Sequence, residues 1–154
     1  MRKVVLALML MCSGCAFAAE LPETVNEWRC VKEDVVPLVL DVNSEDIGRM
    51  VYRDYERGTR KGAVQVILTE GRGTGSLYVP EGVRDSKGAM PSEAGYKIVD
   101  IEGRKSIIEH HEFLPVSLAV NAGENTVITI ESSTLNEKEI TEFARNILQK
   151  SKIQ

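Results

Sequence analysis

The residues best suited to chemistry in this sequence are four consecutive side chains, Glu109-His110-His111-Glu112. They include both histidines of the chain, and histidine serves as a metal ligand and as a general base. On a β-strand, alternation would place Glu109 and His111 on one face, about 7 Å apart along the strand. A zinc site needs three or four converging ligands. Glu109 and His111 are therefore candidate metal ligands, but the sequence favours a solvated strand end without a metal or other cofactor.

Other catalytic patterns are incomplete. The glycine-rich run Gly71–Ser76 lacks the lysine and the spacing of a phosphate-binding loop. No G-x-S-x-G motif marks a nucleophilic serine. The acidic residues allow many carboxylate pairs, but their spacing singles out none. We therefore expect a protein that is not an enzyme. The alternative is a small hydrolase or metal-dependent enzyme that uses the cluster Glu109–Glu112.

A second candidate region is the segment 71–95, which holds six glycines and two prolines. Loops of this length are uncommon unless they are functional or partly disordered. Tyr78 and Tyr96 flank its central part, and tyrosine rings suit contacts with ligands or proteins. These two residues form a candidate binding surface, with packing at the edge of a sheet as the alternative.

The first 18 residues have the pattern of an export signal. Arg2 and Lys3 precede an apolar run and a patch of small residues, which is the order of a secretory signal peptide. The run is too short to span a bilayer. Ala16-Phe17-Ala18 predicts cleavage between Ala18 and Ala19. Ser13-Gly14-Cys15 instead resembles a lipoprotein box, which would make lipidated Cys15 the first mature residue. The expected location is the periplasm or the exterior; the alternative is a membrane-anchored lipoprotein.

The net charge limits the classes of partner to expect, and the cysteine content limits the possible disulfides. The formal net charge is −4, and it becomes about −6 once Arg2 and Lys3 are removed. An acidic protein is poorly suited to nucleic acid, so we expect an envelope protein or a small ligand as partner. Cys30 is the one cysteine outside the signal, so an internal disulfide is excluded after cleavage. Residues 19–27 are expected to be a flexible tether and residues 28–154 a single domain.

Strand and turn signals dominate the predicted domain. Val35–Val42 contains Pro37 and is therefore expected to be an edge strand or an extended segment. The runs Met50–Glu56 and Ala63–Thr69 are expected to form a hairpin. Four further runs between Tyr96 and Glu131 predict an antiparallel meander. Thr134-Leu135-Asn136-Glu137 reads as a capping box that starts a helix. That helix has one apolar face, formed by Ile140, Phe143, Ala144, Ile147 and Leu148.

These elements predict an α+β fold, an antiparallel sheet of about five to seven strands with the C-terminal amphipathic helix packed on one face. Residues 96–150 resemble small exported bacterial domains of the PsbP-like or Mog1-like type, through this order of elements and through Gly103, Thr134, Phe143 and Ala144. The resemblance implies an accessory or binding protein and places no functional residue. We therefore expect an exported, non-enzymatic accessory or binding protein. The alternative is an envelope lipoprotein that serves as an assembly subunit.

Overall fold

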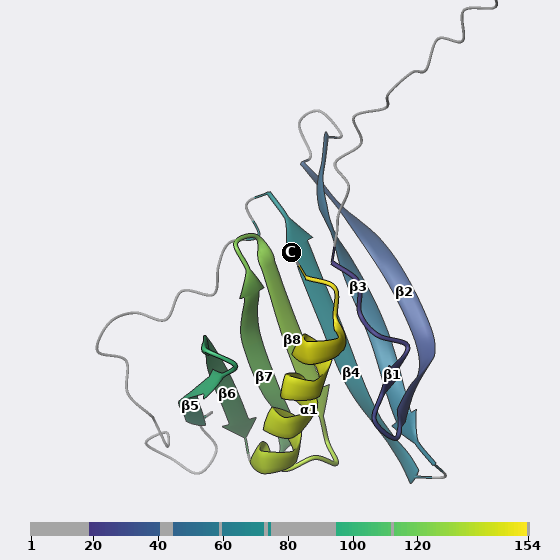
Figure 1. Cartoon of the computed structure of the whole chain (residues 1–154), viewed down its shortest axis with the longest axis vertical. Helices are drawn as coiled ribbons and strands as arrows, with labels where there is room; N and C mark the ends of the chain where they lie inside the picture. Colours follow the sequence, from purple (N-terminus) through teal and green to yellow (C-terminus); the bar gives the residue numbers. More distant parts are fainter. Residues whose placement is uncertain are drawn as a thin grey trace, which may run out of the picture.

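The computed structural model describes residues 19–40, 45–58, 60–72, 74, 95–111 and 113–153. Within them, eight strands form one antiparallel sheet in the order β1-β2-β3-β4-β8-β7-β6-β5. One helix, α1, follows the last strand and lies across one face of the sheet, which we call the inner face (Figure 1). The elements are β1 (Thr24–Val25), β2 (Trp28–Leu40), β3 (Glu45–Arg57), β4 (Arg60–Gly71), β5 (Gly95–Ile101), β6 (Arg104–His111), β7 (Leu114–Gly123), β8 (Thr126–Ser132) and α1 (Glu137–Lys150).

The sheet consists of two four-stranded meanders that meet at their last strands. Strands β1 to β4 follow one another in space, as do β5 to β8, and β4 pairs with β8. Ile67 of β4 lies opposite Thr129 of β8, which in turn lies opposite Ala119 of β7. The C-terminal meander matches the prediction, whereas the pairing that joins the two halves has no local signal in the sequence.

The predicted α+β class and the strand number of five to seven are wrong, because the fold is dominated by a single sheet. The runs 28–31 and 35–42 were expected as separate segments, but residues 28–40 form one continuous strand, β2. Its charged centre, Lys32-Glu33-Asp34, interrupts the apolar pattern, yet an edge strand tolerates charges because one side faces water. Strand β1 has only two residues, too few to produce a periodic signal.

Helix α1 covers the inner face through the apolar stripe that the sequence predicts. Ile140, Phe143, Ala144 and Ile147 are buried. The cap, however, lies two residues further along the chain than expected. Asn136 accepts a hydrogen bond from the backbone N–H of Glu139, and the Glu139 side chain accepts one from the backbone N–H of Asn136. The reciprocal pair satisfies the backbone N–H groups of Asn136 and Glu139, as in a capping box. Thr134 is therefore not the cap. No helix within the described residues is long and apolar enough to cross a membrane.

The core lies between the inner face and α1. Along β8, buried and half-buried residues alternate, as the two-residue repeat of a strand requires. Ile128 and Ile130 of β8 and Val64, Val66 and Leu68 of β4 are at most 1% exposed. Burial of each such side chain contributes about 1.5–3 kcal/mol. This rigid platform positions the polar side chains of β3 described below.

Two glycines face each other where β3 and β4 begin to separate. Gly48 pairs with Gly71, and a Cβ on either residue would overlap the backbone of the other strand. Gly71 also has a φ of 140°, which side-chain-bearing residues rarely adopt. The pair therefore allows a close backbone approach beside Glu70, a residue that becomes important below.

Candidate functional site

The histidine cluster lies at the end of β6, next to the turn into β7. The pairing register of β6 with β7 shifts between Glu109 and His111, which is the mark of a β-bulge. Glu109 and His111 line one shallow cavity of about 310 Å³. The same cavity is bordered by His110, Leu114, Pro115, Ser117 and Glu131. Glu112, the fourth member of the predicted cluster, lies outside the described residues.

The two imidazoles face different neighbours. His110 Nδ1 lies 3.7 Å from a carboxylate oxygen of Glu137, at the start of α1. The backbone N–H of Phe113 donates a 3.2 Å hydrogen bond to Nδ1 of His111, within the turn. Among the residues that the structure describes, no group of three histidine, cysteine or acidic side chains lies close enough to hold a metal ion. The structure thus splits the predicted cluster between the helix and the turn.

The predicted binding surface and processing site are each described only in part. Tyr96 is half-buried on β5, opposite Glu109 in the pairing of β5 with β6. Tyr78, Ala18 and Cys15 lie outside the described residues. Of the residues named in these two predictions, the structure describes Tyr96 and Ala19.

Residues 19–25, which we call the N-terminal strap, pack on the inner face of the sheet. The sequence predicts a flexible tether for residues 19–27, and the observed packing differs from that expectation. Glu20 and Lys152 exchange two backbone hydrogen bonds of 3.1 and 3.2 Å, which tie the strap to the C-terminus of α1. Three strap side chains are at most 4% exposed: Ala19, Leu21 and Val25. Their burial explains why this polar stretch is not a free linker.

Side chains of β3 hold the strap by its backbone carbonyls. Arg49 donates to the carbonyl of residue 19 at 2.8 Å, and Arg53 to that of residue 21 at 2.6 Å. The Tyr55 hydroxyl donates to the carbonyl of residue 22 at 2.6 Å. These donors are separated by even numbers of residues, so they point to the same face of the strand. Without them, buried strap carbonyls would lack partners, which costs about 1–3 kcal/mol each.

Arg53 is 7% exposed and is the most buried charge among the described side chains of β3. Its guanidinium lies 2.5 Å from Glu33 and 3.1 Å from Glu23. Burial lowers the pKa of Arg53, but the hydrogen bonds and the Coulombic interactions with Glu33 and Tyr55 together outweigh burial, so its pKa is raised overall. Burial also raises the pKa of Tyr55 to about 12. Sequence analysis missed both residues, although arginine at core positions of an alternating strand is a signal that could have found them.

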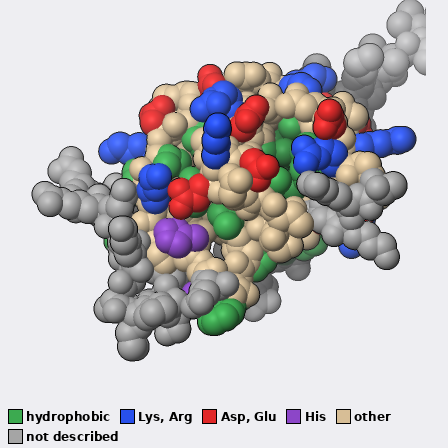
Figure 2. Space-filling view, turned by 90° about the horizontal axis from the view of Figure 1, so that it is seen from below, with side chains coloured by type: hydrophobic (Ala, Val, Ile, Leu, Met, Phe, Trp, Pro, Cys, Tyr) green, Lys and Arg blue, Asp and Glu red, His purple; other side chains and the backbone are tan. Residues whose placement is uncertain are grey.

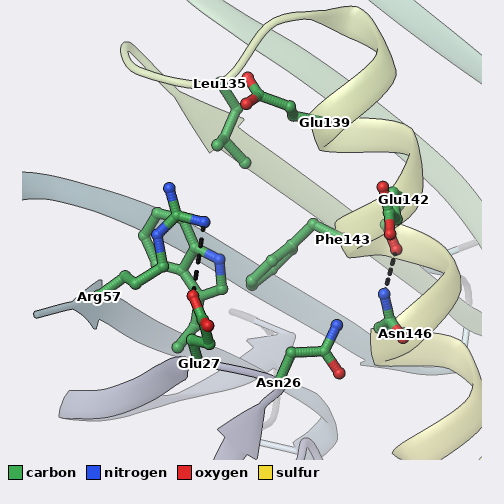
Figure 3. Close-up of a pocket in the computed structure, with 9 residues that line it drawn as sticks. Asn26, Glu27, Arg57, Leu135, Glu139, Glu142, Phe143 and Asn146 are labelled. Atoms are coloured by element: carbon green, nitrogen blue, oxygen red, sulfur yellow. Dashed lines mark hydrogen bonds and ion pairs between the residues drawn. The ribbon is translucent and has the colours of Figure 1, made fainter.

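A groove between α1 and the start of β2 contains the aromatic cluster of the protein (Figure 3). The Phe143 side chain projects from the helix into the groove (Figure 3). Its ring meets that of Trp28 edge-on, with ring centroids 5.7 Å apart. Arg57 lies over the Trp28 ring at 5.1 Å and 3.9 Å from Glu27. The groove measures about 380 Å³, and its rim carries the carboxylates of Glu139 and Glu142. An arginine of the chain itself therefore already occupies the cation position against the indole.

Strand β2 has a free edge over most of its length. Strand β1 pairs with it only at Trp28 and Arg29, whereas β2 follows β3 as far as Leu40. In the described part of the chain, no other strand pairs with that edge. The large exposed hydrophobic residues of β2 are between 45% and 54% exposed: Val31, Val35, Val36 and Val39. An exposed edge of this length is a template for pairing with another chain.

A cavity opens beside this edge on the inner face. It measures about 360 Å³, and its walls include Glu33 and Val35 of β2 and Arg49 and Arg53 of β3. The N-terminal strap closes one side through Ala19, Glu20 and Leu21. The free edge and a charged cavity thus lie next to each other.

Charges of both signs alternate on the end of the molecule seen in Figure 2. Acidic and basic side chains are interspersed over the described elements there, and no broad area of one sign is visible on that face. A face of this kind offers no strong electrostatic attraction to a highly charged polymer.

Comparison with known proteins finds no matching family model, no similar curated protein and no similar solved structure.

Proposed function

We propose that this protein is an exported binding or accessory protein that captures an extended segment of an envelope protein by strand addition to β2. The observation that carries the proposal is the free edge of β2 with its four exposed valines. Unpaired backbone N–H and C=O groups are complementary to an extended peptide, and side-chain pockets beside the edge supply specificity. The signal-like N-terminus supports export.

Pro37 indicates which backbone groups of β2 are available. Proline has no N–H, and in a sheet it occupies positions where that group would face away from the paired strand. The register of β2 with β3 is regular from Lys32 to Leu38, so residues two and four positions before Pro37 share its orientation. The N–H groups of Val35 and Glu33 should therefore face the free edge. An incoming strand would pair there and stop near Pro37.

The cavity beside Val35 gives the proposed partner a chemical preference. An added strand would direct alternate side chains toward the inner face, where Glu33, Arg49 and Arg53 line the walls. These side chains offer both a carboxylate and guanidinium groups. We expect the bound segment to be apolar toward the exposed valines and to place one polar side chain in the cavity.

The test begins with a photo-crosslinking amino acid at Val31 in the exported protein. The crosslinked partner segment is identified by mass spectrometry, synthesised as a peptide, and titrated onto the purified protein. We expect binding that slows amide hydrogen exchange at Glu33 and Val35. Val35→Pro removes one edge donor and should weaken binding at least tenfold. Phe113→Asp, at a residue that is 76% exposed on the β6–β7 turn, is the matched control and should leave affinity unchanged.

Three outcomes would contradict strand addition at β2. The first is an absence of protein adducts at Val31. The second is a peptide affinity that Val35→Pro leaves unchanged while the variant unfolds at the wild-type temperature. The third is adducts formed only with a second copy of the chain, together with a dimer in sedimentation, which would replace the envelope partner by self-association. Val36→Asp provides a second edge variant if Val35→Pro fails to fold.

A further inference from the structure

Glu70 is a buried carboxylate that contacts the first described residue of the strap. Its side chain is 6% exposed. One carboxylate oxygen accepts a 2.6 Å hydrogen bond from Nε of Arg49, and the other accepts a 3.2 Å hydrogen bond from the backbone nitrogen of Ala19. Arg49 also donates to the carbonyl oxygen of Ala19 at 2.8 Å. Glu70 and Arg49 thus bind the backbone N–H and the carbonyl oxygen of Ala19, which is itself 4% exposed.

When the nitrogen of Ala19 is part of an ordinary peptide bond, negative charges outnumber positive charges around this contact. The inner face near the strap carries two guanidinium groups, from Arg49 and Arg53. Among the residues that the structure describes, three carboxylates contact them, from Glu70, Glu33 and Glu23. Glu20 is paired separately with Lys152. One additional positive charge next to Glu70 would balance the cluster, and a buried carboxylate gains most from a charged donor.

The nitrogen in contact with Glu70 belongs to the peptide bond that the A-x-A pattern marks for cleavage. We propose that Glu70 is a binding site for the new α-ammonium group of Ala19, created when a signal peptidase hydrolyses the Ala18–Ala19 bond. Water supplies hydroxide to the carbonyl carbon of Ala18, which becomes a carboxylate. The nitrogen of Ala19, which already carries one hydrogen, takes up both protons of the water and is an ammonium group at neutral pH.

Processing and folding are coupled by this arrangement. Before cleavage, Glu70 accepts one hydrogen bond from a neutral amide; after cleavage, it faces an ammonium group, and hydrogen bonds to charged groups contribute more to stability than neutral ones. The mature N-terminus would then fix the strap that borders the cavity beside β2. Lipidation at Cys15 would leave Ala19 as an amide within the chain, so the ion pair could not form. The proposal depends on cleavage at Ala19 and not on strand addition at β2.

The decisive comparison uses the mature chain in three N-terminal forms. The first begins with a free amine at Ala19, the second begins with acetylated Ala19, and the third retains Ala18. The acetylated form keeps the N–H but lacks the charge. At pH 6 and low salt, we expect the free-amine form to have an unfolding equilibrium constant roughly 10- to 100-fold smaller than the other two. The difference should disappear at high pH, because the stabilising ammonium loses its proton.

Glu70→Gln tests whether the carboxylate is responsible. In this variant the free-amine and acetylated chains should be equally stable, whereas Glu124→Gln, at an exposed turn residue, should preserve the wild-type difference. Because the acetylation comparison needs no substitution, it decides the matter even if Glu70→Gln does not fold. Equal stability of the free and acetylated wild-type chains would overturn the proposal. An exported protein that begins at acylated Cys15 would also overturn it, without affecting the β2 test.

Discussion

The hydroxyl of Tyr55 donates a 2.6 Å hydrogen bond to the carbonyl oxygen of Pro22. This contact joins the C-terminal part of β3 to the N-terminal strap. The same tyrosine ring meets Phe143 of α1 edge-on, with ring centroids 5.8 Å apart. One fully buried side chain therefore connects the sheet, the strap and the helix. Ionisation of Tyr55 should weaken the packing of all three elements.

Stability should fall between about pH 10 and pH 12 because of Tyr55. Burial raises its pKa to about 12, so the folded state retains the phenolic proton over a range in which the unfolded chain has released it. The stabilisation is fully present below pH 10 and is lost as the pH rises through the folded pKa, by about 2–3 kcal/mol in total. Urea unfolding across this range measures it. In Tyr55→Phe, the fall in the free energy of unfolding between pH 10 and pH 12 should lose the part that Tyr55 causes. An unchanged pH dependence would show that other groups cause it.

Arg53→Met should destabilise the protein by about 2–4 kcal/mol. The substitution keeps most of the side-chain volume but leaves the carbonyl of Leu21 without its donor and Glu33 without its partner. Arg145→Met is the control, because Arg145 is 45% exposed and its ion pair with Glu102 lies at the surface. Chemical unfolding, followed by the fluorescence of the single tryptophan, Trp28, reports both variants. Similar losses of unfolding free energy in Arg53→Met and Arg145→Met would contradict the expectation that the buried arginine contributes more to stability.

Asn136→Ala should destabilise the protein by about 1 kcal/mol, because it removes the side-chain oxygen that accepts from the N–H of Glu139. Thr134→Ala should have a smaller effect, since the Thr134 hydroxyl contacts only Ser132, at 3.2 Å. Thermal unfolding of the two variants discriminates the observed cap from the one expected from the sequence. A larger loss for Thr134→Ala would favour the sequence-based assignment.

Local patterns were sufficient for the helix and the C-terminal meander. The stripe of apolar residues on α1 repeats with the helical period; four of its five members are buried, and Leu148 is half-buried. The cap was misplaced by two residues, because Thr134-x-x-Glu137 and Asn136-x-x-Glu139 are equivalent patterns in the sequence. The backbone path after Ser132 decides between them, and the path depends on where the helix meets the sheet.

The candidate site was predicted less well, because it depends on residues brought together from distant parts of the chain. The Glu109–Glu112 cluster has the right residue types, but a bulge and the position of α1 direct its histidines to different neighbours. Glu70 and Ala19 are 51 residues apart and have no shared motif. The free edge of β2 was anticipated only through Pro37, which marked an edge strand.

The sequence by itself determined the signal-like N-terminus, the edge character of β2, the apolar face of α1 and the succession of antiparallel strands. Each of these follows from residue types and spacing within a short window, where the periods of strand and helix can be read directly. Only the tertiary structure decided that all strands form one sheet through the pairing of β4 with β8. It also decided that the strap is buried under Arg49, Arg53 and Tyr55. Both depend on long-range pairing, for which a local pattern carries no information about the partner.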